Sequence, residues 1–261
     1  MSDKKGKPLN VEVNVGKEIQ EIATDFLEPI EVIREAVSNA YDAGSNDFTI
    51  AAKADTDDEG RRILSIEFRD DGIGMDEGTL KAFFGLGMSD EPEIKGREKI
   101  GFKGHGTKTF YSARNIWVAT RRGGALTFAI VENARKQLLK AAKPEPFLFS
   151  GADAEFWLAD KQMRLQGNGT LIRLDDFTAD SGRLIDEFKH KVLENYLRWF
   201  TIAGSIRPVF SPDQKSVMNV RVQGTNETKP FQIEWGHPSA RGSWRSWRSS
   251  RRTPSGRSAP S

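Results

Sequence analysis

Two strand patterns joined by a short acidic turn constrain the fold of this chain more than any other feature. Residues 47–54 (DFTIAAKA) and 62–70 (RILSIEFRD) have the apolar, β-branched and aromatic content of strands, and the turn DTDDEG lies between them. A helix is predicted just before them, over residues 29–43, with Pro29 in its first turn and Gly44 at its end. A helix followed by two such strands predicts a mixed α/β domain.

Further elements are predicted along the rest of the chain. A short helix is expected through about Phe84, with Asp76 as its N-cap. The apolar spacing over residues 182–203 predicts one long amphipathic helix, and three short strand-like runs follow it up to Trp235. More strands are expected at residues 115–121, 125–131 and 169–177, the first two as a hairpin.

The composition excludes several classes of protein. With 261 residues, 37% of them hydrophobic and 10% aromatic, the chain can bury a core and does not have a disordered composition. No apolar run approaches the ~20 residues of a membrane helix, and the first residues lack the apolar core of a secretory signal. Because cysteine is absent, disulfides and Cys-based sites are excluded. We therefore expect a cytoplasmic protein without a membrane partner.

The charge is distributed unevenly. The net charge of the whole chain is +2, but residues 236–261 contain six Arg and no Lys, Asp or Glu. The first 235 residues hold 33 basic and 37 acidic residues, a net charge of −4. We expect this Arg- and Ser-rich tail to be disordered. It could bind nucleic acid or an acidic surface, and the interpretation we favour is a non-native end of the chain.

The helix over residues 29–43 carries polar residues on the side opposite its apolar residues. At 3.6 residues per turn, Glu35, Asn39 and Asp42 fall within about 60° of one another. Two acids and an amide oxygen in one place suit a hard cation such as Mg²⁺, and a carboxylate beside the cation can orient water. Taken alone, the same pattern is typical of an ordinary solvated helix face.

Two glycine-rich stretches follow. The first, Asp70-Asp71-Gly72-Ile73-Gly74-Met75, comes directly after a predicted strand, so its backbone can turn sharply and press against a flat ligand. An ordinary Asp-Gly turn is the plainer interpretation. The second has Gly101, Gly104 and Gly106 before an expected helix, where backbone N–H groups can bind phosphate oxygens. It has neither the spacing of a Walker A loop nor the preceding strand of a dinucleotide fingerprint.

Taken in order, these motifs resemble those of the GHKL ATPases, the Bergerat-fold relatives of DNA gyrase B, the large heat-shock chaperones, MutL and MORC proteins. The shared pattern is Glu-x-x-x-Asn-x-x-Asp-Ala, Asp-x-Gly-x-Gly, Gly-x-x-Gly-x-Gly and a later Gly-Thr, spread over roughly residues 25–177. The resemblance implies an α/β (α+β) two-layer sandwich with a mixed sheet and helices on one face. It also implies that ATP and Mg²⁺ are the ligands.

The resemblance further implies roles for single residues. Glu35 corresponds to the general base that orients water onto the γ-phosphate, and Asn39 to the Mg²⁺ ligand. Asp42 lies where the family has an acid near the nucleotide. Asp70 corresponds to the carboxylate that accepts the adenine amino hydrogen, and Thr170 to the threonine that holds it. The other implied nucleotide contacts are Gly72, Gly74 and Met75 at the purine, Gly101, Gly104 and Gly106 around the phosphates, and the adjoining Thr107 and Lys108.

We expect an ATP-binding domain over residues 1–180, with an ATP lid at about 85–104, and the start of a transducer-like domain over 181–235. The family implies an ATPase that is weak in isolation and homodimerises with ATP to work a clamp or chaperone-like remodelling module on a client protein or DNA. A protein-kinase role is not expected, because histidine kinases lack a base like Glu35. The alternatives are an ATP-binding module with little turnover and a DNA-associated binder that uses the basic tail.

Overall fold

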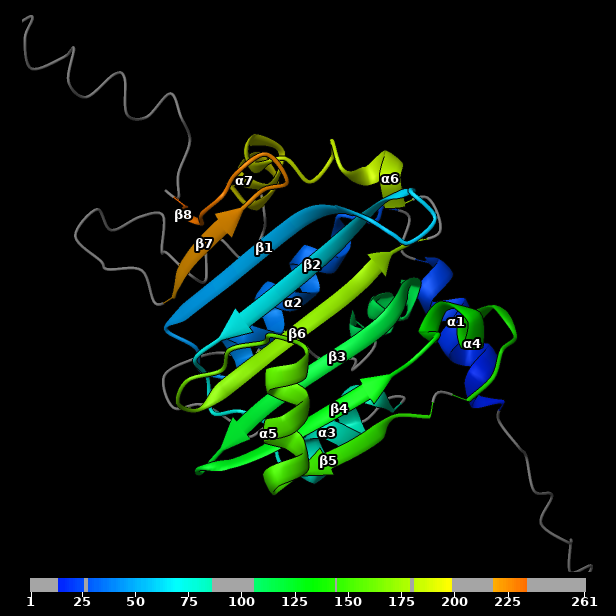
Figure 1. The fold of residues 1–261 in the computed structure, drawn as a ribbon, viewed down its shortest axis with the longest axis vertical. Coiled ribbons are helices and arrows are strands. Elements are labelled where there is room, and N and C mark those ends of the chain that lie inside the picture. The colour runs from blue at the N-terminus through cyan, green and yellow to red at the C-terminus, as the bar shows by residue number, and fades with distance from the viewer. Residues whose placement is uncertain are drawn as a thin grey trace, which may run out of the picture.

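The computed structural model describes residues 14–25, 28–85, 106–143, 145–178, 181–198 and 218–233. These residues form an eight-stranded sheet in the order β5-β4-β3-β6-β2-β1-β7-β8, shown in Figure 1. Its strand pairs are antiparallel except for β1 with β7, which are parallel. The sheet is therefore mixed, as the sequence predicts.

The elements have the following bounds. The strands are β1 Asp47–Thr56, β2 Arg62–Asp70, β3 Ala113–Arg122, β4 Ala125–Val131, β5 Phe147–Ser150, β6 Gly169–Phe177, β7 Asn219–Gln223 and β8 Phe231–Gln232. The helices are α1 Val15–Asp25, α2 Glu31–Asp42, α3 Glu77–Phe84, the 3₁₀ helix η1 Gly106–Ser112, α4 Ala134–Leu139, α5 Gly151–Asp160, α6 Ser181–Leu184 and α7 His190–Arg198.

Most of the predicted elements around the glycine-rich motifs are confirmed. The strands expected from the sequence correspond to β1, β2, β3, β4 and β6, and the predicted hairpin is β3–β4. The cap of α3 is also confirmed, because the Asp76 carboxylate accepts a hydrogen bond from the Thr79 N–H at 2.8 Å. The elements α1, α4, α5 and β5 were not predicted.

The prediction of one long helix over residues 182–203 is wrong, because α6 and α7 are separate. The chain turns between them, and a later loop binds the backbone groups of this turn. The Thr225 hydroxyl donates to the Ile185 carbonyl at 2.7 Å, and the Thr225 N–H donates to the Phe188 carbonyl. The His190 N–H, at the start of α7, donates to the Asn226 side chain at 2.8 Å. These tertiary hydrogen bonds replace helical ones, which apolar periodicity cannot predict.

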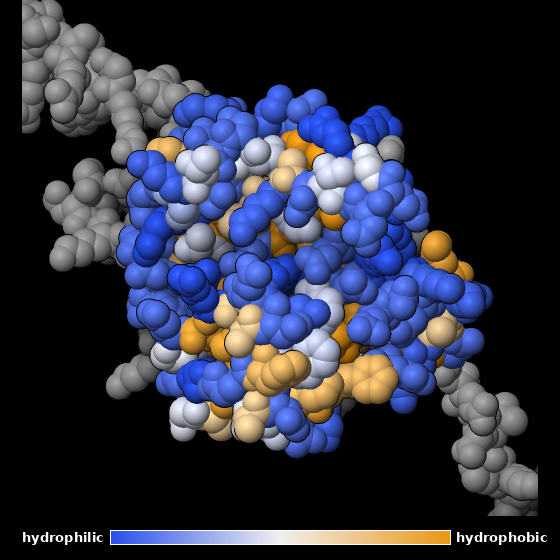
Figure 2. Space-filling view, in the orientation of Figure 1, coloured by the Kyte–Doolittle hydropathy of each residue, from blue (hydrophilic) through white to orange (hydrophobic). Residues whose placement is uncertain are grey.

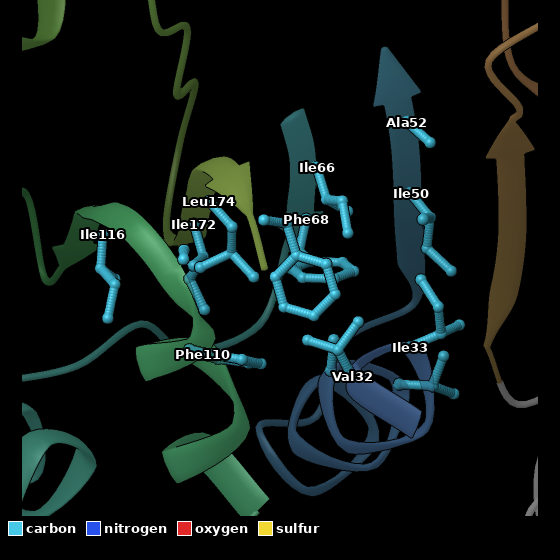
Figure 3. Close-up of a cluster of buried hydrophobic side chains, with 14 of the residues drawn as sticks. Val32, Ile33, Ile50, Ala52, Ile66, Phe68, Phe110, Ile116, Ile172 and Leu174 are labelled. Atoms are coloured by element: carbon cyan, nitrogen blue, oxygen red, sulfur yellow. The ribbon is translucent and has the colours of Figure 1, made fainter. Parts of the chain in front are cut away.

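The main core lies between the sheet and the helices on one of its faces. In Figure 3, Val32 and Ile33 of α2 face the apolar side chains of the sheet, among them Ile50, Ile66 and Phe68. Helix α5 lies on the opposite face, in front of the sheet in Figure 1. It packs on β4 and β5 around a second, smaller buried cluster, to which β3 also contributes side chains. The expected two-layer arrangement thus has one helix added on its outer face.

The chain beyond residue 180 continues this same core. Strand β7 pairs with β1 in the sheet, with Val220 opposite Phe48. Phe188 and Leu193 are fully buried in the cluster that also holds the α2 residues. The described residues on the two sides of position 180 therefore share one sheet and one core, and the proposed division at 180 stays a prediction.

The outer face is mainly hydrophilic. Figure 2 shows an apolar area in its lower part, in the region that α5 and β5 occupy in Figure 1. Phe147 and Leu148 of β5 and Phe156 of α5 are exposed. Among the described helices, none has the length and apolar character to cross a membrane.

Candidate functional site

An open pocket of about 620 Å³ lies between α2, the strands β1, β2 and β6, and the segment that leads into α3. Apolar side chains such as Phe48, Phe68 and Ile172 form much of its wall. Six residues that the sequence singled out also line it, although they come from three separate parts of the chain: Asn39, Asp42, Asp70, Gly74, Met75 and Thr170.

Asp70 ends β2 at the rim of this pocket. Its Oδ1 accepts hydrogen bonds from the Gly72 N–H at 2.9 Å and the Thr170 N–H at 3.2 Å. Burial raises the pKa of Asp70 to about 7, although these two hydrogen bonds act to lower it. Asp70 thus has a desolvated carboxylate that is fixed through one oxygen and lies in a mostly apolar pocket.

The neighbouring Asp71 has a different environment. Its Oδ1 accepts hydrogen bonds from the Ser45 hydroxyl and from the N–H groups of Asn46 and Asp47, each at 2.8 Å. Burial acts to raise the pKa of Asp71, but these hydrogen bonds outweigh it and the pKa is lowered. Asp71 therefore ties the loop between α2 and β1 to the end of β2, and only Asp70 lines the pocket.

Thr120 of β3 holds the turn that closes the pocket. It is fully buried, and its Oγ1 accepts a hydrogen bond from the Met75 N–H at 2.7 Å. The same hydroxyl lies 3.2 Å from Thr170 Oγ1. Gly74 has φ of +72°, and a Cβ there would lie 2.2 Å from the Arg121 carbonyl oxygen. The turn thus needs glycine at position 74 and a hydroxyl at position 120.

Helix α2 supplies the polar wall of the pocket. Asn39 and the buried Asp42 both line it. Their spacing on α2 places them on the side predicted from the sequence, because the apolar side is buried in the core. An amide oxygen and a carboxylate therefore lie at the same pocket as Asp70.

Glu35 lies one helical turn before Asn39 and meets the start of η1. A Cβ on Gly106 would lie 1.6 Å from Glu35 Oε2, so the carboxylate occupies the space that any other residue at 106 would fill. Burial raises the pKa of Glu35, and the neighbouring Arg34 opposes that rise. The first described residue of the glycine-rich stretch is thus in direct contact with the predicted general base.

Lys108 lies deeper, between η1 and the end of α3. Its side chain is fully buried, and its Nζ donates to the Phe83 carbonyl at 2.9 Å and to the Thr107 hydroxyl at 2.8 Å. The Thr107 hydroxyl donates to the same Phe83 carbonyl. Burial lowers the pKa of Lys108 to about 7. Lys108 and Thr107 thus join η1 to α3, and their predicted contacts with the nucleotide stay predictions.

Some predicted features lie outside the described residues. These are Gly101 and Gly104, the predicted lid except Gly85, and the tail over residues 236–261.

Sequence reasoning missed Thr120 and Arg34. Thr120 lies in an otherwise ordinary strand pattern, and only the pairing of β3 with β6 brings it beside Thr170. Arg34 precedes Glu35 directly, but residues next to each other on a helix point about 100° apart, so the spacing gives no sign of their contact.

Comparisons with known proteins agree with this geometry. Residues 27–146 match the family of histidine kinase-, DNA gyrase B- and HSP90-like ATPases. A stretch of 98 residues, 36% of the chain, is 30% identical to the DNA mismatch repair protein MutL of Chlorobium phaeobacteroides (strain BS1) and covers 15% of it.

A solved structure, the N-terminal domain of a DNA repair protein, has the same fold. It superimposes with a TM-score of 0.50 at 14% sequence identity, over 85% of this chain and 56% of that one. The chain thus spans a small part of the MutL protein and just over half of the solved structure. Residues 27–146 are therefore similar to the GHKL ATPases, and the chain has the Bergerat ATP-binding fold.

Proposed function

We propose that this protein binds Mg²⁺·ATP in the pocket and hydrolyses it slowly, as the ATP-gated dimerisation switch of a clamp or remodelling protein. One observation carries the proposal: Asp70, Thr170, Asn39 and Asp42 line a single pocket. Glu35 lies one helical turn from Asn39. The match of residues 27–146 to a family of ATPases supports ATP as the ligand.

Asp70 is the residue proposed to recognise adenine. Both of its backbone hydrogen bonds use Oδ1, so Oδ2 is the oxygen that can accept the hydrogen of an exocyclic amino group. Gly74 and Met75, held by Thr120, provide a backbone wall against which a flat purine can pack. The N–H groups of Gly72 and Thr170 hold the carboxylate through its Oδ1.

Asn39 and Asp42 are proposed to face the phosphates and Mg²⁺. Among the described residues, no three His, Cys, Asp or Glu side chains cluster into a complete metal site. The chemistry of Asn39 and Asp42 nevertheless fits Mg²⁺, which commonly takes one or two protein oxygens and completes its shell with phosphates and water. When bound, Mg²⁺ would offset the negative charge on the phosphates.

Glu35 is proposed to act as the general base. Its buried environment raises the pKa of its carboxyl group above the usual range, which favours proton abstraction near neutral pH. Its contact with Gly106 places it beside the glycine-rich stretch proposed to hold the phosphates. Hydrolysis then requires an oriented water and a base rather than a covalent nucleophile.

The test is Glu35→Gln, which keeps the shape of the side chain. We expect the dissociation constant of ATP to stay within about threefold of wild type and the turnover number to fall about 100-fold or more. The matched control is Glu155→Gln on α5, an exposed acid paired with Arg121, which should leave both quantities unchanged. Wild-type turnover in Glu35→Gln would contradict the proposed role.

The dimerisation switch is tested by light scattering with and without a non-hydrolysable ATP analogue. A shift from monomer to dimer with the analogue is expected, and no change with saturating analogue would contradict a switch within this chain. Calorimetric binding of ATP with no measurable turnover would instead favour the module without catalysis. DNA binding that weakens with salt and is lost on deleting residues 236–261 would favour the basic-tail alternative.

A further inference from the structure

Arg34 contacts the proposed base directly. Its Nη2 lies 3.2 Å from Glu35 Oε1 and 2.8 Å from Glu31 Oε2, so one nitrogen bridges two carboxylates. Glu31 and Glu35 are four residues apart on α2, a spacing at which like charges face and repel each other. Arg34 therefore joins two acids that would otherwise push apart.

The contact between Arg34 and Glu35 is not a consequence of helix geometry. Side chains of adjacent helical residues diverge, so the guanidinium has to fold back to reach Glu35. Arg34 Nε is buried and has no hydrogen-bond partner among the described residues. A buried donor without a partner is unfavourable, so other interactions maintain this conformation against that cost.

Helix α7 contributes Tyr196 to the cluster of Glu31, Arg34 and Glu35. Tyr196 lies close enough for its hydroxyl group to interact electrostatically with Glu31, Arg34 and Glu35. Its ring also packs against the main core. Burial, and then the charge of Glu31, raise the pKa of Tyr196 to about 12, so it is neutral at physiological pH. Tyr196 therefore adds no charge to this cluster, and the positive charge that contacts Glu35 in it is that of Arg34.

The two oxygens of Glu35 have different neighbours. Oε1 contacts the guanidinium of Arg34, and Oε2 lies against Gly106. With the first oxygen held, the carboxylate cannot rotate freely, and the second oxygen stays at the start of η1. We propose that Arg34 is a positioning residue for ATP hydrolysis, which orients Glu35 through this contact and is itself held by Glu31. The inference rests on the proposed role of Glu35.

The test compares Arg34→Ala with Arg34→Lys in steady-state ATP hydrolysis. We expect Arg34→Ala to lower kcat about tenfold or more, because a misplaced base loses its alignment with water. KM and the dissociation constant of ATP should change less than about threefold, since Arg34 does not line the pocket. Arg34→Lys should restore kcat to within about threefold of wild type, because an ammonium can still bridge the two acids.

Arg61→Ala is the matched control, because Arg61 also bridges two acids, Asp57 and Glu59, in the turn between β1 and β2. It should not change kcat. If Arg34→Ala keeps the wild-type kcat while Glu35→Gln is inactive, the inference about Arg34 is overturned and the proposed function is not. If kcat falls equally in Arg34→Ala and Arg34→Lys and both variants lose the same thermal stability, the inference is also overturned, because such a result indicates a structural role for Arg34. Wild-type turnover in Glu35→Gln overturns the proposed function itself.

Discussion

At the scale of single residues, the pocket contains a buried carboxylate, Asp70, whose charge does not stabilise the protein in the absence of a ligand. Burial raises the pKa of Asp70 to about 7, whereas an aspartate in the unfolded chain titrates near 3.8. Between these two pH values the folded protein binds more protons than the unfolded chain. The contribution of Asp70 to the free energy of unfolding is therefore present below about pH 4 and is lost as the pH rises through 7. The carboxylate that we propose to bind the purine amino group thus opposes stability at neutral pH.

Asp70→Asn is expected to stabilise the free protein while it weakens ATP binding. The amide oxygen can still accept the N–H groups of Gly72 and Thr170, and the cost of burying a charge is removed. The free energy of unfolding at pH 8 should rise by about 1–3 kcal/mol, and by much less at pH 4.

Urea titrations at the two pH values and ATP calorimetry measure these effects. Loss of stability at pH 8, or ATP binding as tight as in wild type, would contradict this assignment of Asp70.

At the scale of elements, the site depends on the pairing of strands that are distant in sequence. Strand β6 lies between β2 and β3, so Thr170 meets Asp70 on one side and Thr120 on the other. The hydroxyl of Thr120 then reaches the Met75 N–H beyond the end of β2. The proposed purine wall is thus fixed by the sheet rather than by the turn alone.

Thr120→Val should weaken ATP binding about tenfold, because the variant keeps the shape of the side chain but removes the acceptor for Met75 N–H. Stability should also fall by about 1 kcal/mol, since this partly buried donor loses its partner. Thr120→Ser retains the hydroxyl and should bind ATP nearly as wild type does.

Thr127→Val on β4, which does not line the pocket, is the control for a general effect of the substitution on the sheet. The prediction fails if Thr120→Val and Thr127→Val give the same ATP affinity in calorimetry.

At the scale of the whole molecule, the described residues before and after position 180 share one core. Phe188, Leu193 and Val220 are fully buried in it, and β7 pairs with β1. Each large apolar side chain of this kind contributes about 1.5–3 kcal/mol when buried. Because several are involved, their combined contribution is comparable to the whole stability of a typical domain.

A chain cut after residue 180 should therefore not unfold cooperatively. Removing the residues after 180 leaves β1 without β7 and uncovers part of the apolar face of the sheet. Circular dichroism melts compare it with a chain cut after residue 235, which should unfold at the temperature of the full chain. A sharp, unshifted transition in the shorter chain would show instead that residues 1–180 fold independently.

The sequence by itself determined the local parts of this protein. Helix α2, strands β1 and β2 and the cap at Asp76 follow from periodicity and turn chemistry, which act between neighbours along the chain. The order of the motifs also indicated the superfamily. The shared pocket of Asn39, Asp70 and Thr170 could be expected through the resemblance to that family.

Only the tertiary structure decided that Asp71 binds the loop between α2 and β1, and that Thr120 holds the wall of the pocket. It also decided that α6 and α7 are separate helices. The physical reason is common to these cases. Burial and hydrogen bonds between distant segments fix charge, orientation and helix ends, and a pattern along one segment contains no information about them.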